Sequence, residues 1–192
     1  MTRFIHDQFA KNYLCERLSP LGIVNPGREV NSEVRQIDVY FTPTTLNSDY
    51  IKTLGVLGKM ATTAALFEVF RNPAGVDEIC DCVNKLLDIK AQWQRKSKRD
   101  NPSEIEVEPP KLWILTPTAS EAVLSGFNPT TDEVNWLRGI YFLGEHFRTA
   151  IVVIHQLPDI PETLWLRILG RGRVQENAIR ALAALPVDDR GR

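Results

Sequence analysis

Two carboxylates interrupt apolar, strand-like segments of the sequence. Asp38 lies in the segment 35–41 and Glu68 in the segment 64–70, and both segments are rich in β-branched and aromatic residues, a composition typical of strands. A carboxylate at such a position must be paired, metal-bound or solvent-facing, because burying it bare is costly. If the two strands are neighbours, Asp38 and Glu68 converge on one divalent cation.

The chemistry that such a pair supports is phosphodiester hydrolysis. That reaction needs charge neutralisation on the phosphate oxygens and an activated water, and Mg²⁺ held by carboxylates provides both. A nearby lysine stabilises developing negative charge and helps to orient the water. We therefore take Asp38 and Glu68 as candidate Mg²⁺ ligands and Glu16, on the flank of a predicted first helix, as an assisting carboxylate.

Hydrophobic periodicity and turn residues predict the elements that position these side chains. The predicted order is helix 7–18, strands 28–30 and 34–42, a short helix or ordered loop in 49–63, strand 64–71, helix 76–99, strand 111–116, helix 119–124, strands 140–143 and 150–156, and two helical pieces in 161–185. The apolar stripe of the long helix consists of Val76, Ile79, Val83, Leu86 and Trp93. This order favours an α/β fold with a mixed central sheet flanked by helices. We expect residues 1–160 to form one domain and residues 161–192 a helical extension packed on it.

Composition sets limits on the class of protein. The 192 residues include 43% hydrophobic and 24% charged residues with a net charge of -1, which is ordinary for a globular protein. The near-zero charge does not advertise nucleic-acid binding, although a local groove can be basic. The three cysteines and the lack of an apolar signal core indicate reduced thiols and a cytoplasmic location. No apolar run approaches the roughly 20 residues that span a membrane.

Basic residues gather in two places, at residues 90–99 and near the C-terminus. The second set consists of Arg167, Arg171, Arg173 and Arg180. Such sets hold phosphates in some proteins and are simply solvated in others. The segment Gly170-Arg171-Gly172-Arg173 lacks the lysine and the Ser/Thr of a phosphate-binding loop, so it also reads as a helix break that exposes two arginines.

The order of the acidic residues resembles the PD-(D/E)XK nuclease-like superfamily, in which a first helix often carries Glu, a strand carries Asp and the next strand carries Glu-x-Lys. The segments 7–11, 33–39, 66–73 and 163–173 are similar to a group of cyanobacterial proteins of unassigned function, related to the recombination-promoting nuclease and transposase-like branch. This resemblance implies a restriction-endonuclease-like sheet, Mg²⁺ and DNA as a partner. The likeness to the group covers most of the chain, whereas the nuclease pattern covers only residues 7–90.

The sequence departs from that pattern at one position. Phe70 stands where the motif has lysine, and it shares a strand face with Glu68, whereas Arg71 should point to the other face. A replacement lysine must come from the long helix. Lys85 lies just outside its apolar stripe and Lys90 in the middle of it, and we prefer Lys85 because it is nearer the helix start that follows Glu68.

Each candidate also has a structural interpretation. Asp38 can be hydrogen-bonded within an edge strand, and Glu68 can pair with Arg35 or Arg71. Lysines on a helix are commonly solvated, and Glu16 beside Arg17 is typical of a surface charge. Two functions therefore stay open: a Mg²⁺-dependent phosphodiesterase resembling DNA endonucleases, and a catalytically inactive binding or assembly protein on the same scaffold. The second would use exposed apolar residues of the final strands and helix to form a homodimer or bind a partner.

Overall fold

The computed structural model describes residues 2–30, 35–44, 48–100 and 108–185. In these segments six strands form one sheet in the order β1-β2-β3-β4-β6-β5. The strands are β1 (Gly22–Val30), β2 (Arg35–Pro43), β3 (Ala65–Val69), β4 (Lys111–Thr116), β5 (Ile140–Phe142) and β6 (Thr149–Val153). β3, β4 and β6 run parallel, while β1, β2 and β5 pair antiparallel with their neighbours. The prediction of a mixed α/β sheet is thus confirmed.

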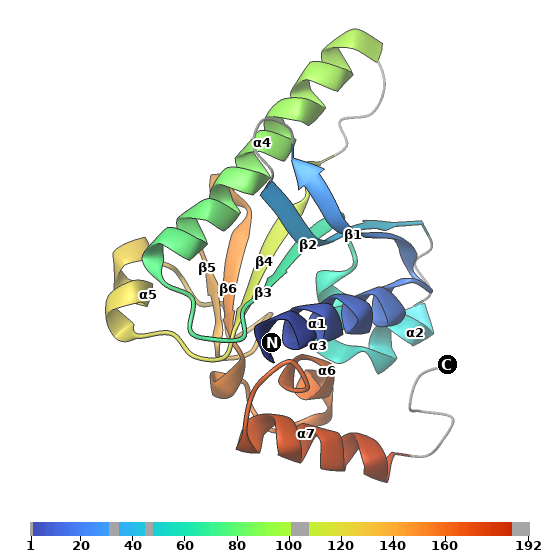
Figure 1. Ribbon diagram of the computed structural model, residues 1–192, viewed down its shortest axis with the longest axis vertical. Helices are drawn as coiled ribbons and strands as arrows, with labels where there is room; N and C mark the ends of the chain where they lie inside the picture. Colours follow the sequence, from blue (N-terminus) through green and yellow to red (C-terminus); the bar gives the residue numbers. More distant parts are fainter. Residues whose placement is uncertain (1, 31–34, 45–47, 101–107, 186–192) are drawn as a thin grey trace.

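Helices cover both faces of the sheet (Figure 1). One face packs against α4 (Val76–Asp100) and α5 (Glu121–Phe127). The opposite face packs against α1 (Thr2–Leu18), α2 (Ser48–Thr53), α3 (Gly55–Met60), α6 (Leu164–Arg167) and α7 (Arg173–Ala184). Three short 3₁₀ helices complete the described segments: η1 (Glu145–Phe147), η2 (Ile154–Gln156) and η3 (Pro161–Thr163).

The buried strand β3 shows why both faces must be covered. All five of its residues are buried, with Leu66 in the core on the α4 side and Phe67 in the core on the α1 side. A strand with this composition is stable only between two helical layers. Glu68, on the same face as Leu66, therefore has to find its partners within the α4 layer.

Three expectations about the elements are corrected. Val76 is 51% exposed, so the buried stripe of α4 begins at Ile79 and continues through Cys82, Val83, Leu86 and Ile89. The segment 49–63 forms two short helices, α2 and α3, rather than one helix or a loop. The strand predicted over 150–156 ends at Val153, because the chain turns into η2 there.

The C-terminal segment shares the core of the sheet. Leu164, Trp165 and Leu166 of α6 and Ala178 of α7 are buried in the same cluster as Leu14 of α1. The indole N–H of Trp165 also donates to the carbonyl oxygen of Thr53 at 2.7 Å. Among the described helices, none is long and apolar enough to cross a membrane.

Candidate functional site

The candidate site lies where β2 and β3 part. Their ladder runs from Phe41 opposite Ala65 to Val39 opposite Phe67, and this register continued by one position sets Asp38 opposite Glu68. There the backbone pairing stops, and the Oδ2 atom of Asp38 accepts a hydrogen bond from the N–H of Val69 at 2.9 Å. A side-chain carboxylate thus replaces a ladder partner. β2 lies between β1 and β3, so the edge-strand interpretation of Asp38 is wrong.

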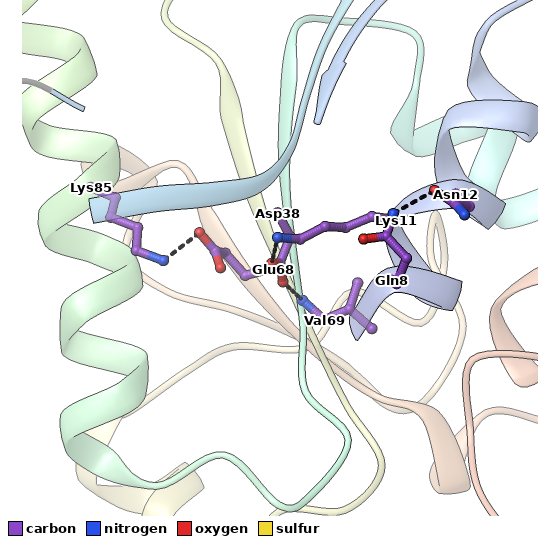
Figure 2. A network of polar contacts seen from close by, with 7 residues as sticks. All are labelled: Gln8, Lys11, Asn12, Asp38, Glu68, Val69 and Lys85. Atoms are coloured by element: carbon purple, nitrogen blue, oxygen red, sulfur yellow. Dashed lines mark hydrogen bonds and ion pairs between the residues drawn. The ribbon is translucent and has the colours of Figure 1, made fainter. Parts of the chain in front are cut away.

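Glu68 points into the layer beneath α4 and is only 4% exposed. Its Oε1 atom accepts a hydrogen bond from Lys85 Nζ at 2.8 Å (Figure 2). Burial, followed by the negative charge of Asp38, raises the pKa of Glu68 to about 7, although Lys85 and Lys11 both act to lower it. Burial thus favours the protonated carboxyl group, whereas the two lysines favour the carboxylate. Its ion pair is with Lys85 and not with the suggested Arg71; the side chain of Arg35 lies outside the described atoms.

Lys85 reaches the sheet from the third turn of α4. Partial burial acts to lower its pKa, but the Glu68 carboxylate outweighs that effect, so the net pKa is raised and the ammonium stays charged. This is the geometry anticipated for the preferred lysine. Lys90, the other lysine considered, is not among the residues that line the pocket described below.

Lys11 of α1 is a member of the site that the sequence reasoning missed. Its Nζ atom lies 3.3 Å from Oδ1 of Asp38, on the side of the carboxylate opposite α4 (Figure 2). The sequence did contain an indication that Lys11 faces the sheet. Lys11 falls three residues before Leu14 and seven before Leu18, a spacing that defines one helix face, and both leucines are fully buried. The residue proposed from that helix, Glu16, lies elsewhere: its side chain is 70% exposed and pairs with Arg17.

Asp38, Glu68 and Lys85 border an open pocket of about 350 Å³, here called the carboxylate pocket. Its lining residues are Asp38, Glu68, Val69, Phe70, Arg71, Asn72, Glu78, Asp81, Cys82 and Lys85. Phe70 lines the pocket, as expected, although it lies just beyond the end of β3. Arg71 lines it too, which corrects the expectation that it points away: β3 ends at Val69, so strand alternation no longer applies.

The donor chemistry of the pocket suits a hard divalent cation. Mg²⁺ is commonly held by one or two carboxylates together with waters and substrate phosphates, and Asp38 and Glu68 offer such a pair. In the described part of the chain, no group of three or more His, Cys, Asp or Glu residues is arranged to hold a metal ion. Each carboxylate has a lysine as its partner, so a cation would compete with Lys11 and Lys85.

Comparison with protein-family models, with curated proteins and with solved structures finds no significant match to this chain. We therefore infer function from the residues of the carboxylate pocket and their geometry.

Proposed function

We propose that the protein is a Mg²⁺-dependent phosphodiesterase that acts on DNA, built on a restriction-endonuclease-like sheet. The observation that carries the proposal is the meeting of Asp38, Glu68 and Lys85 in one pocket, contributed by β2, β3 and α4. Two strand carboxylates next to a partly buried ammonium are groups that phosphodiester hydrolysis can use. Because the three residues lie far apart in the sequence, only the tertiary structure brings their side chains together.

Each side chain has a defined task in this mechanism. Asp38 and Glu68 would hold Mg²⁺, which when bound neutralises phosphate oxygens and lowers the pKa of water. Lys85, 2.8 Å from Glu68, donates to a phosphate oxygen that gains negative charge. It takes the role of the motif lysine, whose position is occupied by Phe70 in this chain. Lys11 orients Asp38 through its contact at 3.3 Å.

Cleavage assays test the proposal. Supercoiled plasmid and bis(p-nitrophenyl) phosphate are incubated with the protein in Mg²⁺ or in EDTA. We expect Mg²⁺-dependent cleavage that falls at least about 100-fold in Asp38→Ala and Lys85→Met, the loss typical when one group that stabilises charge in the transition state is removed. Glu176→Gln, an exposed residue of α7, is the control and keeps the parent rate. Equal cleavage by the parent and Asp38→Ala would reject the proposal.

A second candidate, a catalytically inactive binding or assembly protein, is favoured by a different observation. Both carboxylates are already neutralised by lysines, and the aromatic ring of Phe70 lines the pocket where the motif has lysine. Such a protein binds no Mg²⁺ in calorimetric titration and cleaves neither substrate. Its partner would be DNA or a second copy of the chain, and sedimentation that shows only monomer would exclude the self-associating form.

A further inference from the structure

A second pocket, of about 390 Å³, opens beside β5 and η2. Its lining residues are Thr131, Glu133, Arg138, Gly139, Tyr141, His155 and Gln156, and we call it the lateral pocket. Its volume falls within the range of roughly 300–1,000 Å³ that is typical of small-ligand sites. None of its residues takes part in the carboxylate pocket.

The lining of the lateral pocket combines hydrogen-bond donors, acceptors and an aromatic ring. Arg138 supplies donors and Glu133 supplies carboxylate acceptors. The hydroxyl of Tyr141 donates to Oε1 of Gln156 at 2.6 Å, which fixes both side chains and leaves the Gln156 amide N–H groups for a ligand. A phosphate would meet the like charge of Glu133. The edge of a nucleobase, with donors and acceptors side by side, matches the mixed lining better.

Arg171 connects the lateral pocket with the carboxylate pocket. Its backbone N–H donates to Nε2 of His155 at 3.4 Å, and its Nη1 atom donates to Oδ1 of Asn72 at 3.0 Å. The same Nη1 atom donates to the carbonyl oxygen of Arg71 at 3.5 Å. His155 lines one pocket, and Arg71 and Asn72 line the other, so the hydrogen bonds of Arg171 link residues of both pockets.

The local backbone holds Arg171 in this position. Gly172 follows it with φ +53, a conformation that favours glycine. Burial, followed by the charge of Arg171, lowers the pKa of His155, so the imidazole is neutral at pH 7 and can accept the backbone hydrogen bond. Arg171 is exposed, and its guanidinium group has further N–H donors that suit a phosphate.

We infer that the lateral pocket takes one unpaired nucleobase of a strand, that Arg171 contacts the adjacent backbone phosphate, and that the strand continues into the carboxylate pocket. The last part rests on the proposed phosphodiesterase function, whereas base binding in the lateral pocket does not. The substrate class is therefore single-stranded or locally unpaired nucleic acid, since a base within a duplex cannot leave the stack without an energetic cost.

Fluorescence polarisation in EDTA tests this inference, because no cleavage occurs under that condition. The probes are a labelled 12-nucleotide single strand, the same strand as a duplex, and a 12-unit strand whose sugars carry no bases. The variants are Arg138→Gln and Arg171→Gln. Arg173→Gln, an exposed arginine two residues further along the chain that lines neither pocket, removes the same charge and is the matched control. Thermal unfolding verifies that each variant is folded.

We expect the parent protein to bind the single strand more tightly than the duplex or the baseless strand. Arg138→Gln weakens binding of the base-carrying strand by about fivefold or more, the range for one good contact to a base, and leaves binding of the baseless strand unchanged. Arg171→Gln weakens binding of both strands, and Arg173→Gln neither. A double-mutant comparison of protein variant and base removal isolates the contact.

The outcomes separate this inference from the proposed function. Loss of base-dependent binding in Arg138→Gln supports the lateral pocket even if the parent protein cleaves no phosphodiester. Equal affinity of Arg138→Gln and the parent for the base-carrying strand overturns it, even if Mg²⁺-dependent cleavage is found. A parent protein that binds the baseless strand as tightly as the natural strand, or binds neither, also overturns it.

Discussion

Glu68 is the carboxyl group of the candidate site whose pKa is strongly raised. It is buried beneath α4, next to the negative charge of Asp38, and its compensation comes from Lys85 at 2.8 Å. A buried ion pair of this kind is weak support for stability, because removing two charges from water offsets much of their attraction. Both residues line the carboxylate pocket, which fits a functional role, because groups with shifted pKa values cluster at active sites.

The raised pKa of Glu68 makes stability depend on pH. Between its unfolded value near 4.5 and its folded value of about 7, the folded protein holds a proton that the unfolded chain has lost, so stability falls as pH rises through this window. We expect the free energy of unfolding of the parent, relative to Glu68→Gln, to decrease by up to about 3 kcal/mol from pH 4.5 to 8. Urea titrations at several pH values measure it, and parallel pH profiles for the two proteins would contradict it.

Lys85→Met tests the ion pair from the other side. At pH 8 the variant leaves an ionised Glu68 without its partner, and we expect a loss of about 1–3 kcal/mol in the free energy of unfolding. At pH 5.5 the loss is smaller, because a protonated Glu68 needs no counter-charge. Lys90→Met, on the same helix but outside the pocket, is the control. A loss that is the same at both pH values would show that Lys85 acts through packing of its alkyl chain.

At the scale of elements, two junctions position the site and its support. The first is the end of the β2–β3 ladder, where the Asp38 carboxylate caps the N–H of Val69. The second is the joint between α2 and α3 at Gly55, which has φ +56 and lies directly against η3. A Cβ atom at Gly55 would be 2.3 Å from the carbonyl oxygen of Glu162, so only glycine permits this approach.

Gly55→Ala should therefore destabilise the protein substantially. The left-handed backbone and the contact with the Glu162 backbone both oppose a side chain, and we expect a loss of about 2–4 kcal/mol. Gly126→Ala in α5 is the matched control, since a Cβ atom there meets nothing within 4 Å and alanine favours a helix. Chemical denaturation measures both variants. A Gly55→Ala protein as stable as the parent would show that the α2–α3 joint can move away from η3.

At the scale of the whole molecule, residues 161–185 cover the face of the sheet that carries α1. Trp165 is 3% exposed and Leu166 is fully buried, and the hydroxyl of Tyr13 in α1 donates to the carbonyl oxygen of Trp165 at 2.8 Å. The guanidinium of Arg17 lies over the Trp165 ring, 5.1 Å from its centroid. α1, which brings Lys11 to Asp38, is therefore held between the sheet and α6.

A chain that ends at residue 160 should lose cooperative folding. Truncation exposes the apolar surface that α6 and α7 cover. Removing a single large buried side chain such as Trp165 lowers the free energy of unfolding by about 3–5 kcal/mol. We expect the truncated protein to bind a hydrophobic dye and to unfold without a sharp transition. The full chain should show one transition by fluorescence and circular dichroism alike. A cooperative, compact product of the truncation would assign residues 161–185 to a separate unit.

Much of the fold follows from local patterns in the sequence. The apolar segment 64–70 and the long amphipathic helix that follows it are recognisable because period and composition report burial residue by residue. The same patterns single out Asp38 and Glu68, since a carboxylate in an apolar strand needs a partner wherever the strand lies. They also narrow the search for a lysine to Lys85 and Lys90.

The sequence by itself determined which side chains need compensation, and only the tertiary structure decided what compensates them. The partner of Asp38 is Lys11, which sequence patterns did not single out, and Glu16 pairs with Arg17 instead. The packing of α1 on the sheet and its contacts with Trp165 of α6 set which of its side chains face Asp38. The parting of β2 and β3 and the position of Arg171, which is hydrogen-bonded to a residue of each pocket, likewise depend on contacts between distant residues. Such contacts leave no periodic trace in the sequence, because they arise from the register and packing of whole elements.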